Sequence, residues 1–292
     1  MLQRVAIYCK ENKPRTAESV NRLVEGFYRR GIRVFLHQKP VAGEACSAKE
    51  PFERFTDLGG LKELPDLVLS VGGDGTFLDT MLKVRDFGIP IAGVNTGRMG
   101  FLANITEDEI DHSLGLLSKG EYQVIERSLL EIRKPADIFD PGDSTALNEV
   151  TIQKADPSMI TIHVHVDGAF LNTYWSDGLI VSTATGSTAY NLAVGGPILS
   201  PEDESIIISP ISPHNLTIRP IVISGESILR MVVEGRSNEY VATCDFRSRR
   251  LPFSEEIIIS RSDDKLKTVM LKGIDFYSTL RNKLMWGADR RN

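Results

Sequence analysis

The chain has 292 residues, enough for two domains, and its 41% apolar and 25% charged content is ordinary for a globular protein. The net charge of −5 argues against a nucleic-acid-binding protein, since such proteins carry a basic excess. No apolar run approaches the length that spans a bilayer. We therefore expect neither nucleic acid nor a membrane as a partner.

The cysteines and histidines predict no metal centre. Cys9, Cys46 and Cys244 lie far apart, and the five histidines are scattered, so no metal-ligand spacing occurs. Free thiols fit a reducing compartment, and residues 1–8 are typical of a first strand rather than of a signal peptide. We predict a cytoplasmic protein.

Residues 1–121 alternate between strand and helix patterns. We expect a variable loop at 41–57, a capping box from Thr106 to Glu109 that opens a helix, and strands and helices over 5–8, 20–28, 34–36, 67–71, 74–82, 89–94 and 106–117. This order predicts an α/β domain, a parallel sheet with flanking helices. Ligands of such sheets bind at the carboxyl ends of the strands.

Residues 122–274 show short strand patterns divided by Gly, Pro, Asn and Ser, which predict an all-β, sandwich-like second domain. Asp167-Gly168 is expected to be a hairpin turn. Arg247 to Arg250 is expected to be a solvated loop, with a basic cluster that faces a polyphosphate as the alternative. Strands are expected at 122–133, 148–154, 160–166, 179–181, 206–208, 221–223, 229–233, 240–243, 257–259 and 269–271. The tail, 275–292, carries apolar residues at helical spacing, and we expect it to rejoin the first domain.

The most informative stretch is Gly72-Gly73-Asp74-Gly75-Thr76, which lies between a strand and a helix. Glycines let the backbone approach a ligand, and N–H groups at such a turn attract phosphate. A carboxylate in a phosphate cradle would repel phosphate, so Asp74 indicates a metal or a hydroxyl group that is held and deprotonated. The alternative is a tight turn with Asp74 as the helix N-cap.

A second glycine turn, Asn95-Thr96-Gly97-Arg98-Met99-Gly100-Phe101, follows the next buried strand. Arg98 offers a partner for phosphate. Because both turns follow strands of one predicted sheet, we expect them to face one cleft. An ordinary loop is the alternative.

Two motifs of the second domain suggest a nucleotide site. Asn148-Glu149 opens a strand, and an amide beside a carboxylate can bind adenine and ribose hydroxyls; a solvated strand end is the alternative. The segment from Asp177 to Tyr190 ends in a run of small hydroxyl residues and a tyrosine that could stack on a base. A Ser/Thr-rich turn that caps a helix is the alternative.

These motifs together resemble the bacterial NAD kinase family, in the family's order and over about the whole chain. The resemblance rests on Gly72–Thr76, Asn95–Gly97 with Gly100–Leu102, Asn148-Glu149, Asp177–Tyr190, Gly195–Pro197, Pro213-His214 and Arg219-Pro220. It implies the two-domain NAD kinase fold and transfer of the ATP γ-phosphoryl group to the 2′-hydroxyl of the adenosine ribose of NAD, giving NADP. It also implies a divalent metal, Mg²⁺ or Mn²⁺, bound with ATP, and a homo-oligomer, dimer or tetramer.

The resemblance assigns roles to residues of this chain and implies a site between the two domains. Asp74 would orient the hydroxyl and accept its proton. Asn148 and Glu149 would hold adenine and ribose hydroxyls, and Tyr190 would stack against a base. Further residues expected to bind NAD are Gly75, Phe101, Trp175, Asp177, Thr188, Ala189, Asn191, Leu192 and Ala193, and those expected to bind phosphate are Gly72, Gly73, Gly75, Thr76 and Arg98.

The chain departs from the family pattern at four places: Trp175 for a frequent Arg, Ala184 for Pro, Ala193 for Ser, and Phe246-Arg247 for Gly-Gln. The loss of a cation at 175 and its gain at 247 affect the expected contacts of phosphate or nicotinamide. Two other functions remain open, a lipid kinase of the diacylglycerol type and a non-catalytic dinucleotide-binding regulator. An apolar groove or basic patch would favour the first, and the presence of Asp74 argues against the second.

Overall fold

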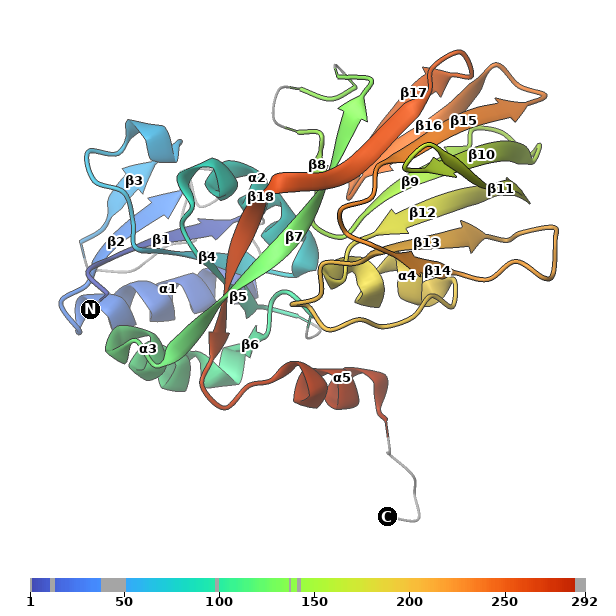
Figure 1. Ribbon diagram of the computed structural model, residues 1–292. Helices are drawn as coiled ribbons and strands as arrows, with labels where there is room; N and C mark the ends of the chain where they lie inside the picture. Colours follow the sequence, from blue (N-terminus) through green and yellow to red (C-terminus); the bar gives the residue numbers. More distant parts are fainter. Residues whose placement is uncertain are drawn as a thin grey trace. The chain divides into compact units, whose positions relative to one another are not determined.

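A computed structural model describes residues 2–10, 14–37, 51–97, 100–136, 138–140 and 143–286, and Figure 1 shows its helices and strands. The chain divides into two compact units: Met1–Glu126 with Leu266–Asn292, and Arg127–Lys265. We expected boundaries after residues 121 and 274, whereas the units divide after residues 126 and 265. Among the described residues, no helix is long and apolar enough to cross a membrane.

The first unit is built on a parallel sheet with strand order β3-β2-β1-β4-β5. Short β6 and the end of β18 also pair with β5 in parallel. Of the loop expected at 41–57, residues 41–50 lie outside the described residues. Strand β3 lies in the remainder, and there the expectation was wrong because three residues paired with β2 leave little apolar pattern. The strands are β1 (Arg4–Cys9), β2 (Arg33–His37), β3 (Glu53–Phe55), β4 (Leu67–Gly72), β5 (Ile91–Asn95), β6 (Ile105–Thr106) and β18 (Ile257–Leu271).

Helices cover both faces of this sheet. Side chains of α1 (Pro14–Tyr28) and α3 (Ile110–Lys119) share one core with alternate residues of the strands, among them Val5 and Ile7. The other face meets α2 (Asp74–Val84), where Thr80 Oγ1 donates to Ser70 Oγ at 2.9 Å. The predicted capping box of Thr106 and Glu109 is confirmed. The remaining helices of the unit are η1 (Leu58–Gly60), η2 (Arg85–Phe87), η3 (Glu107–Glu109) and α5 (Phe276–Leu284).

The second unit contains two antiparallel arrays of strands, which confirms the predicted fold class. One has the order β14-β13-β12-β9-β16-β17, and the other runs β11-β10-β15-β18. Strands β7 and β18 each pass from one unit to the other. The bounds are β7 (Tyr122–Lys134), β8 (Thr145–Ala146), β9 (Glu149–Lys154), β10 (Ile160–Val166), β11 (Ala169–Ser176), β12 (Gly178–Ser182), β13 (Ile206–Ile211), β14 (Ile221–Ile223), β15 (Leu229–Gly235), β16 (Glu239–Cys244) and β17 (Arg247–Pro252), with helices η4 (Thr185–Thr188) and α4 (Tyr190–Ala193).

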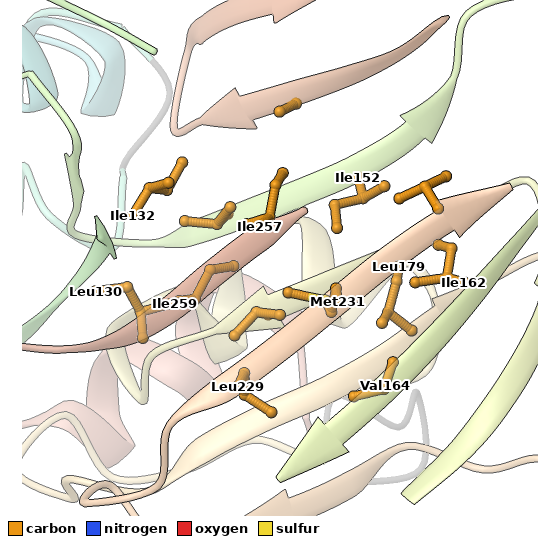
Figure 2. Close-up of a cluster of buried hydrophobic side chains, with 14 of the residues drawn as sticks. Leu130, Ile132, Ile152, Ile162, Val164, Leu179, Leu229, Met231, Ile257 and Ile259 are labelled. Carbon is orange, nitrogen blue, oxygen red and sulfur yellow. The ribbon is translucent and has the colours of Figure 1, made fainter. Parts of the chain in front are cut away.

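The core of the second unit is formed by the inward-facing residues of both arrays (Figure 2). Ile152 and Leu179 come from β9 and β12, and Ile162, Val164 and Met231 come from β10 and β15. All five are at most 1% exposed. The alternation of buried and exposed residues along β10 is the feature that made this strand predictable.

Two expectations for the second unit were wrong. The stretches 257–259 and 269–271, expected as separate strands, belong to the single strand β18; its exposed polar middle, Asp263 to Lys265, interrupts the apolar pattern. Arg247 to Arg250, expected as a solvated loop, lies in β17 and pairs with β16. An exposed edge strand needs no apolar alternation, so the sequence pattern does not reveal it.

The packing of α1 yields a stability prediction. Phe27 is fully buried in the core of the first unit, whereas the next residue, Tyr28, is 45% exposed. Phe27→Ala should lower the free energy of unfolding by about 3–5 kcal/mol, because it leaves a cavity. Tyr28→Ala is the matched control and should change it by less than about 1 kcal/mol. Chemical unfolding measures both; equal losses would contradict the assignment of Phe27 to the core.

Candidate functional site

The predicted glycine turn connects β4 to α2. Gly72 has φ +154°, and a Cβ there would lie 2.3 Å from Thr76 Oγ1, so this position requires glycine. The alternative interpretation of Asp74 as the N-cap was wrong: Gly73 holds that position, and Asp74 is the first residue of α2. The carboxylate of Asp74 is therefore not used to cap its own helix.

Asp74 is held instead by the loop that follows β5. Its Oδ2 accepts the backbone N–H of Phe101 at 3.0 Å, and its Oδ1 accepts those of Leu102 and Ala103 at 3.1 and 3.0 Å. A Cβ on Gly100 would lie 1.8 Å from Asp74 Oδ1, so the carboxylate occupies the space that a side chain would need. Three N–H donors fix the orientation of this carboxylate, and Oδ2, which accepts only one of them, keeps capacity for a further donor.

The glycines beside Asp74 leave open space. Gly73 and Gly75 are exposed, have no positive φ, and a Cβ at either would meet no atom of the described residues within 4 Å. The fold itself therefore does not require glycine at these two positions. Room for a ligand at the start of α2, where the helix dipole favours an anion, explains them.

The two predicted turns lie side by side. Gly72 pairs with Asn95 at the ends of parallel β4 and β5, and Asn95 Oδ1 accepts the N–H of Gly97 at 2.7 Å. Thr76, expected to bind phosphate, is buried beneath the turn. Arg98, expected to bind phosphate, lies outside the described residues. The hydrogen bonds of Asp74 thus connect the two glycine turns.

In the second unit, the Asn148-Glu149 pair is held by another aspartate. Asp245 lies in the turn between β16 and β17 with φ 51°, and its carboxylate accepts the backbone N–H groups of Leu147, Asn148 and Glu149 at 2.9, 2.8 and 3.3 Å. Burial raises the pKa of Asp245, and the three N–H donors act against that rise. Sequence reasoning missed Asp245; its only signal was a polar residue in a hairpin turn.

Arg247, a departure from the family pattern, is used within the protein. Its guanidinium donates to the carbonyls of Cys244, Asp143 and Thr145 at 3.1, 2.6 and 2.7 Å. Its side chain is 10% exposed. This cation fixes the loop before β9 and the β16–β17 turn, so its charge is already satisfied by backbone oxygens.

The carboxyl group of Glu149 lies close to that of Asp245, and its pKa is strongly raised. Burial, and then the nearby charge of Asp245, raise the pKa of Glu149 to about 8, although the Tyr190 N–H donates to it. Its Oε2 is buried without a hydrogen-bond partner. Asp245 has three N–H donors where Glu149 has one, so at neutral pH the proton of this pair resides on Glu149. A protonated Glu149 can donate to a ligand oxygen as well as accept from one.

The hydroxyl-rich run packs directly on the Asn148-Glu149 pair. Thr183 Oγ1 donates to the Leu147 carbonyl at 2.6 Å and accepts the Gly186 N–H at 3.0 Å. A Cβ on Gly186 would lie 2.1 Å from the Asn148 carbonyl oxygen. Asn148, Glu149 and Tyr190 are thereby brought together, and the ring of Tyr190 is 37% exposed.

Other predicted residues of this run differ in accessibility. Asn191 is fully buried, donates to the carbonyls of Ser187 and Pro197 and accepts from Ser209 Oγ, so its amide closes the loop. Thr188 donates to the Thr185 carbonyl. Thr188, Ala189 and Leu192 are half-buried and Ala193 is exposed.

Trp175 and Asp177 lie away from this cluster within the second unit. Ser182 pairs with Glu149 and Gly178 with Gln153, so Asp177 lies just before the opposite end of β12, about 16 Å along the strand direction. Asp177 pairs with Lys154 at 2.6 Å, and Trp175 is 46% exposed on β11. The structure does not bring these two residues next to Glu149.

A resident metal centre finds no support among the described residues. They contain no group of three or more His, Cys, Asp or Glu side chains that could hold an ion. The carboxylate of Asp74 already accepts three N–H groups. The donor set therefore does not fit a metal bound by the protein alone.

Comparison with known proteins places this arrangement in a family. Residues 5–122 match the ATP-NAD kinase N-terminal domain, and residues 147–271 match the ATP-NAD kinase C-terminal domain. The chain is similar to NAD kinases of Cytophaga hutchinsonii (43% identical, 82% of this chain and 81% of that protein) and Flavobacterium psychrophilum (36% identical, 99% and 100%).

Solved structures show the same fold. An NAD kinase from Archaeoglobus fulgidus in complex with ATP matches with a TM-score of 0.74, 28% identity, and coverage of 97% of this chain and 99% of that chain. Yeast NADH kinase complexed with NADH matches with a TM-score of 0.82, 24% identity, and coverage of 99% and 89%.

These findings make the protein an ATP-dependent phosphotransferase. The chain belongs to the ATP-NAD kinase family, and its activity is the phosphorylation of NAD.

The close approach of Gly100 to Asp74 yields a prediction. Gly100→Ala should displace the carboxylate and lower kcat by about 10²-fold, since misplacement by about 1 Å has this cost. Gly97→Ala, whose Cβ would meet only Asn95 Oδ1 at 3.8 Å, is the matched control and should retain kcat within a few-fold. Steady-state kinetics compare the two, and a fully active Gly100→Ala chain would contradict this geometry.

The buried carboxyl group of Glu149 yields a second prediction. Its pKa in the folded chain, about 8, lies above the ordinary value of 4.5, so wild-type stability is lost progressively as the pH rises from about 4.5 to 8. Glu149→Gln removes this loss. Its melting temperature should exceed that of the wild type at pH 9, and the difference should vanish near pH 4.5.

The control for this measurement is Glu239→Gln on β16, whose side chain is 50% exposed. It should show no comparable pH-dependent gain. Parallel melting curves of Glu149→Gln and the wild type from pH 5 to 9 would contradict the raised pKa.

Proposed function

We propose that Asp74 is the general base of phosphoryl transfer from ATP to the 2′-hydroxyl of the adenosine ribose of NAD. The observation that carries this proposal is the fixed carboxylate, held by three N–H donors and flanked by two glycines that the fold does not need. An oriented acceptor beside open space suits a hydroxyl group that must be aligned before it reacts.

In the proposed step, the 2′-oxygen forms a bond to the γ-phosphorus while the bond from that phosphorus to the β–γ bridging oxygen breaks. ADP leaves with the bonding electron pair, and the hydroxyl proton passes to the Asp74 carboxylate. In a loose transition state the alcohol becomes acidic only as its new bond forms, so orientation matters at least as much as basicity. Oδ2, with a single N–H donor, is the oxygen that accepts the hydroxyl.

We propose that the second unit binds NAD and that its site is completed by Asp74 of the first unit. Asn148 and Glu149 would hold the adenine and ribose hydroxyls, and the half-exposed Tyr190 would stack on a base. The exposed Ala193 and half-buried Thr188, Ala189 and Leu192 would line the pocket. Asn191 would contribute by holding the loop, since its amide is already engaged.

The roles of Trp175, Asp177 and Phe101 in NAD binding remain part of the proposal. Asp177 lies about 16 Å along the strand direction from the residue that pairs with Glu149, and Trp175 lies on β11; the far end of an extended dinucleotide suits that separation of Asp177 from Glu149. The Phe101 N–H is already used by Asp74, so this residue would contribute its ring.

Phosphate binding is assigned to the start of α2. The open space at Gly73 and Gly75 admits phosphate oxygens, Gly72 shapes the turn, and Thr76 supports it from beneath. Arg98 is proposed as a further phosphate partner. Mg²⁺ or Mn²⁺ would arrive bound to the phosphates of ATP.

We propose a homo-oligomer, dimer or tetramer, working in the cytoplasm. That compartment supplies ATP and NAD and keeps thiols such as the buried Cys9 and Cys244 reduced. The oligomer rests on the family resemblance alone, and sedimentation of the purified chain decides it.

The general-base assignment yields the central prediction. Asp74→Asn should lower turnover by at least about 10³-fold, because the amide cannot take the proton, while NAD affinity stays within about tenfold. The assay contains ATP, Mg²⁺ and NAD and detects NADP with an NADP-specific dehydrogenase. Asp86→Asn, an exposed change in η2, is the control. Near-normal turnover of Asp74→Asn would reject the assignment.

A further inference from the structure

A lysine of the C-terminal helix lies beside Asp74. Lys283 is in the last turn of α5, and its Nζ lies 4.1 Å from the centroid of the Phe101 ring. The N–H of Phe101 is the group that donates to Asp74 Oδ2. A cation is thus separated by one residue from the carboxylate of the candidate site, although 209 positions divide Lys283 from Asp74 in the sequence.

This lysine makes no direct ion pair within the described part of the chain, although the charge of Asp74 lies nearby. Lys283 is half-buried and makes no ion pair or side-chain hydrogen bond there. Burial lowers the pKa of Lys283, and the charge of Asp74 opposes that effect. Other cations of the first unit differ: the exposed Lys272 pairs with Glu121, and Arg22 pairs with Asp111. Partial burial of an ammonium group without a partner oxygen is unfavourable, so an anion should complete the site.

The neighbourhood defines the chemical class of that anion. Asp74 lies at the start of α2, next to the open space at Gly73 and Gly75, where a phosphate is favoured. A phosphoryl group in transfer carries its charge on three oxygens, and an ammonium group is a compact charge with three donors. The amino group therefore suits the transferring phosphoryl group, while Asp74 takes the proton.

We propose that Lys283 is a phosphate-binding residue of this enzyme, whose ammonium group contacts the γ-phosphoryl group as it moves to the hydroxyl held by Asp74. The inference rests on the function proposed for Asp74. It makes α5 a part of the catalytic machinery.

A purely structural role predicts a different outcome. Lysine over an aromatic ring contributes about 0.5–1 kcal/mol at exposed sites, so Lys283 could simply dock α5 on Phe101. Methionine separates the two roles, because its thioether still packs on the ring but carries no charge. Arginine keeps the charge and extends the range over which the group stays protonated.

The test compares Lys283→Met, Lys283→Arg and the control Arg281→Met, which removes an exposed charge from the same helix. Lys283→Met should lower kcat by about 10²-fold, the usual cost of losing one stabilising group, with KM for NAD within about threefold. Lys283→Arg should recover kcat to within about tenfold of the wild type. The control Arg281→Met should have the kcat of the wild type.

The pH profile supplies an independent readout. The wild type should lose kcat on the alkaline side as Lys283 loses its proton, and Lys283→Arg should remove or delay that loss. Each variant's melting temperature is measured alongside, and it should stay within a few degrees of the wild type.

Three results would overturn the proposal: Lys283→Met with at least a third of wild-type kcat, a loss of kcat that arginine does not recover, or a loss that follows a fall in melting temperature. Failure of the proposed function is distinguishable, because then Asp74→Asn would remain active. An active wild type with inactive Asp74→Asn and fully active Lys283→Met would reject only the inference on Lys283.

Discussion

The candidate site of the first unit depends on one interaction, the acceptance of three successive N–H groups by the Asp74 carboxylate. It joins the turn after β4 to the loop after β5, which are separated in the sequence. It also explains why Gly100 has no side chain. Remove this contact and the two loops lose their common anchor, and the carboxylate loses its direction.

The second unit contains the same kind of interaction. Asp245 accepts the N–H groups of Leu147, Asn148 and Glu149, again three consecutive residues. Arg247 donates hydrogen bonds to the carbonyls of Asp143 and Thr145, which precede this segment. In both units an aspartate carboxylate from a distant turn fixes a short loop by its backbone. Such a loop is anchored through its backbone N–H groups, so the anchoring does not use the side chains of Phe101, Asn148 or Glu149.

Sequence patterns reveal the parts of the fold that bury apolar residues at a regular period. The strand β10 and the helix α1 were predictable for that reason. The segment from Gly72 to Thr76 was predictable as a ligand-binding turn because glycine-rich turns between a strand and a helix commonly bind phosphate. Edge strand β17 and the polar middle of β18 were not, since neither alternates. Asp245 and Lys283 could not be predicted from local sequence patterns, because each contacts residues of the candidate site that are far from it in the sequence.

Strand β18 has a consequence for how the molecule is made. Its beginning supplies Ile257 and Ile259 to the core of the second unit, and its end supplies Val269 and Leu271 to the core of the first. During synthesis the first 126 residues emerge before the second unit, yet the first unit lacks Val269 and Leu271 until the whole of Arg127–Lys265 has been made. The unit that begins to emerge first can therefore complete its core only after the second unit has been synthesised.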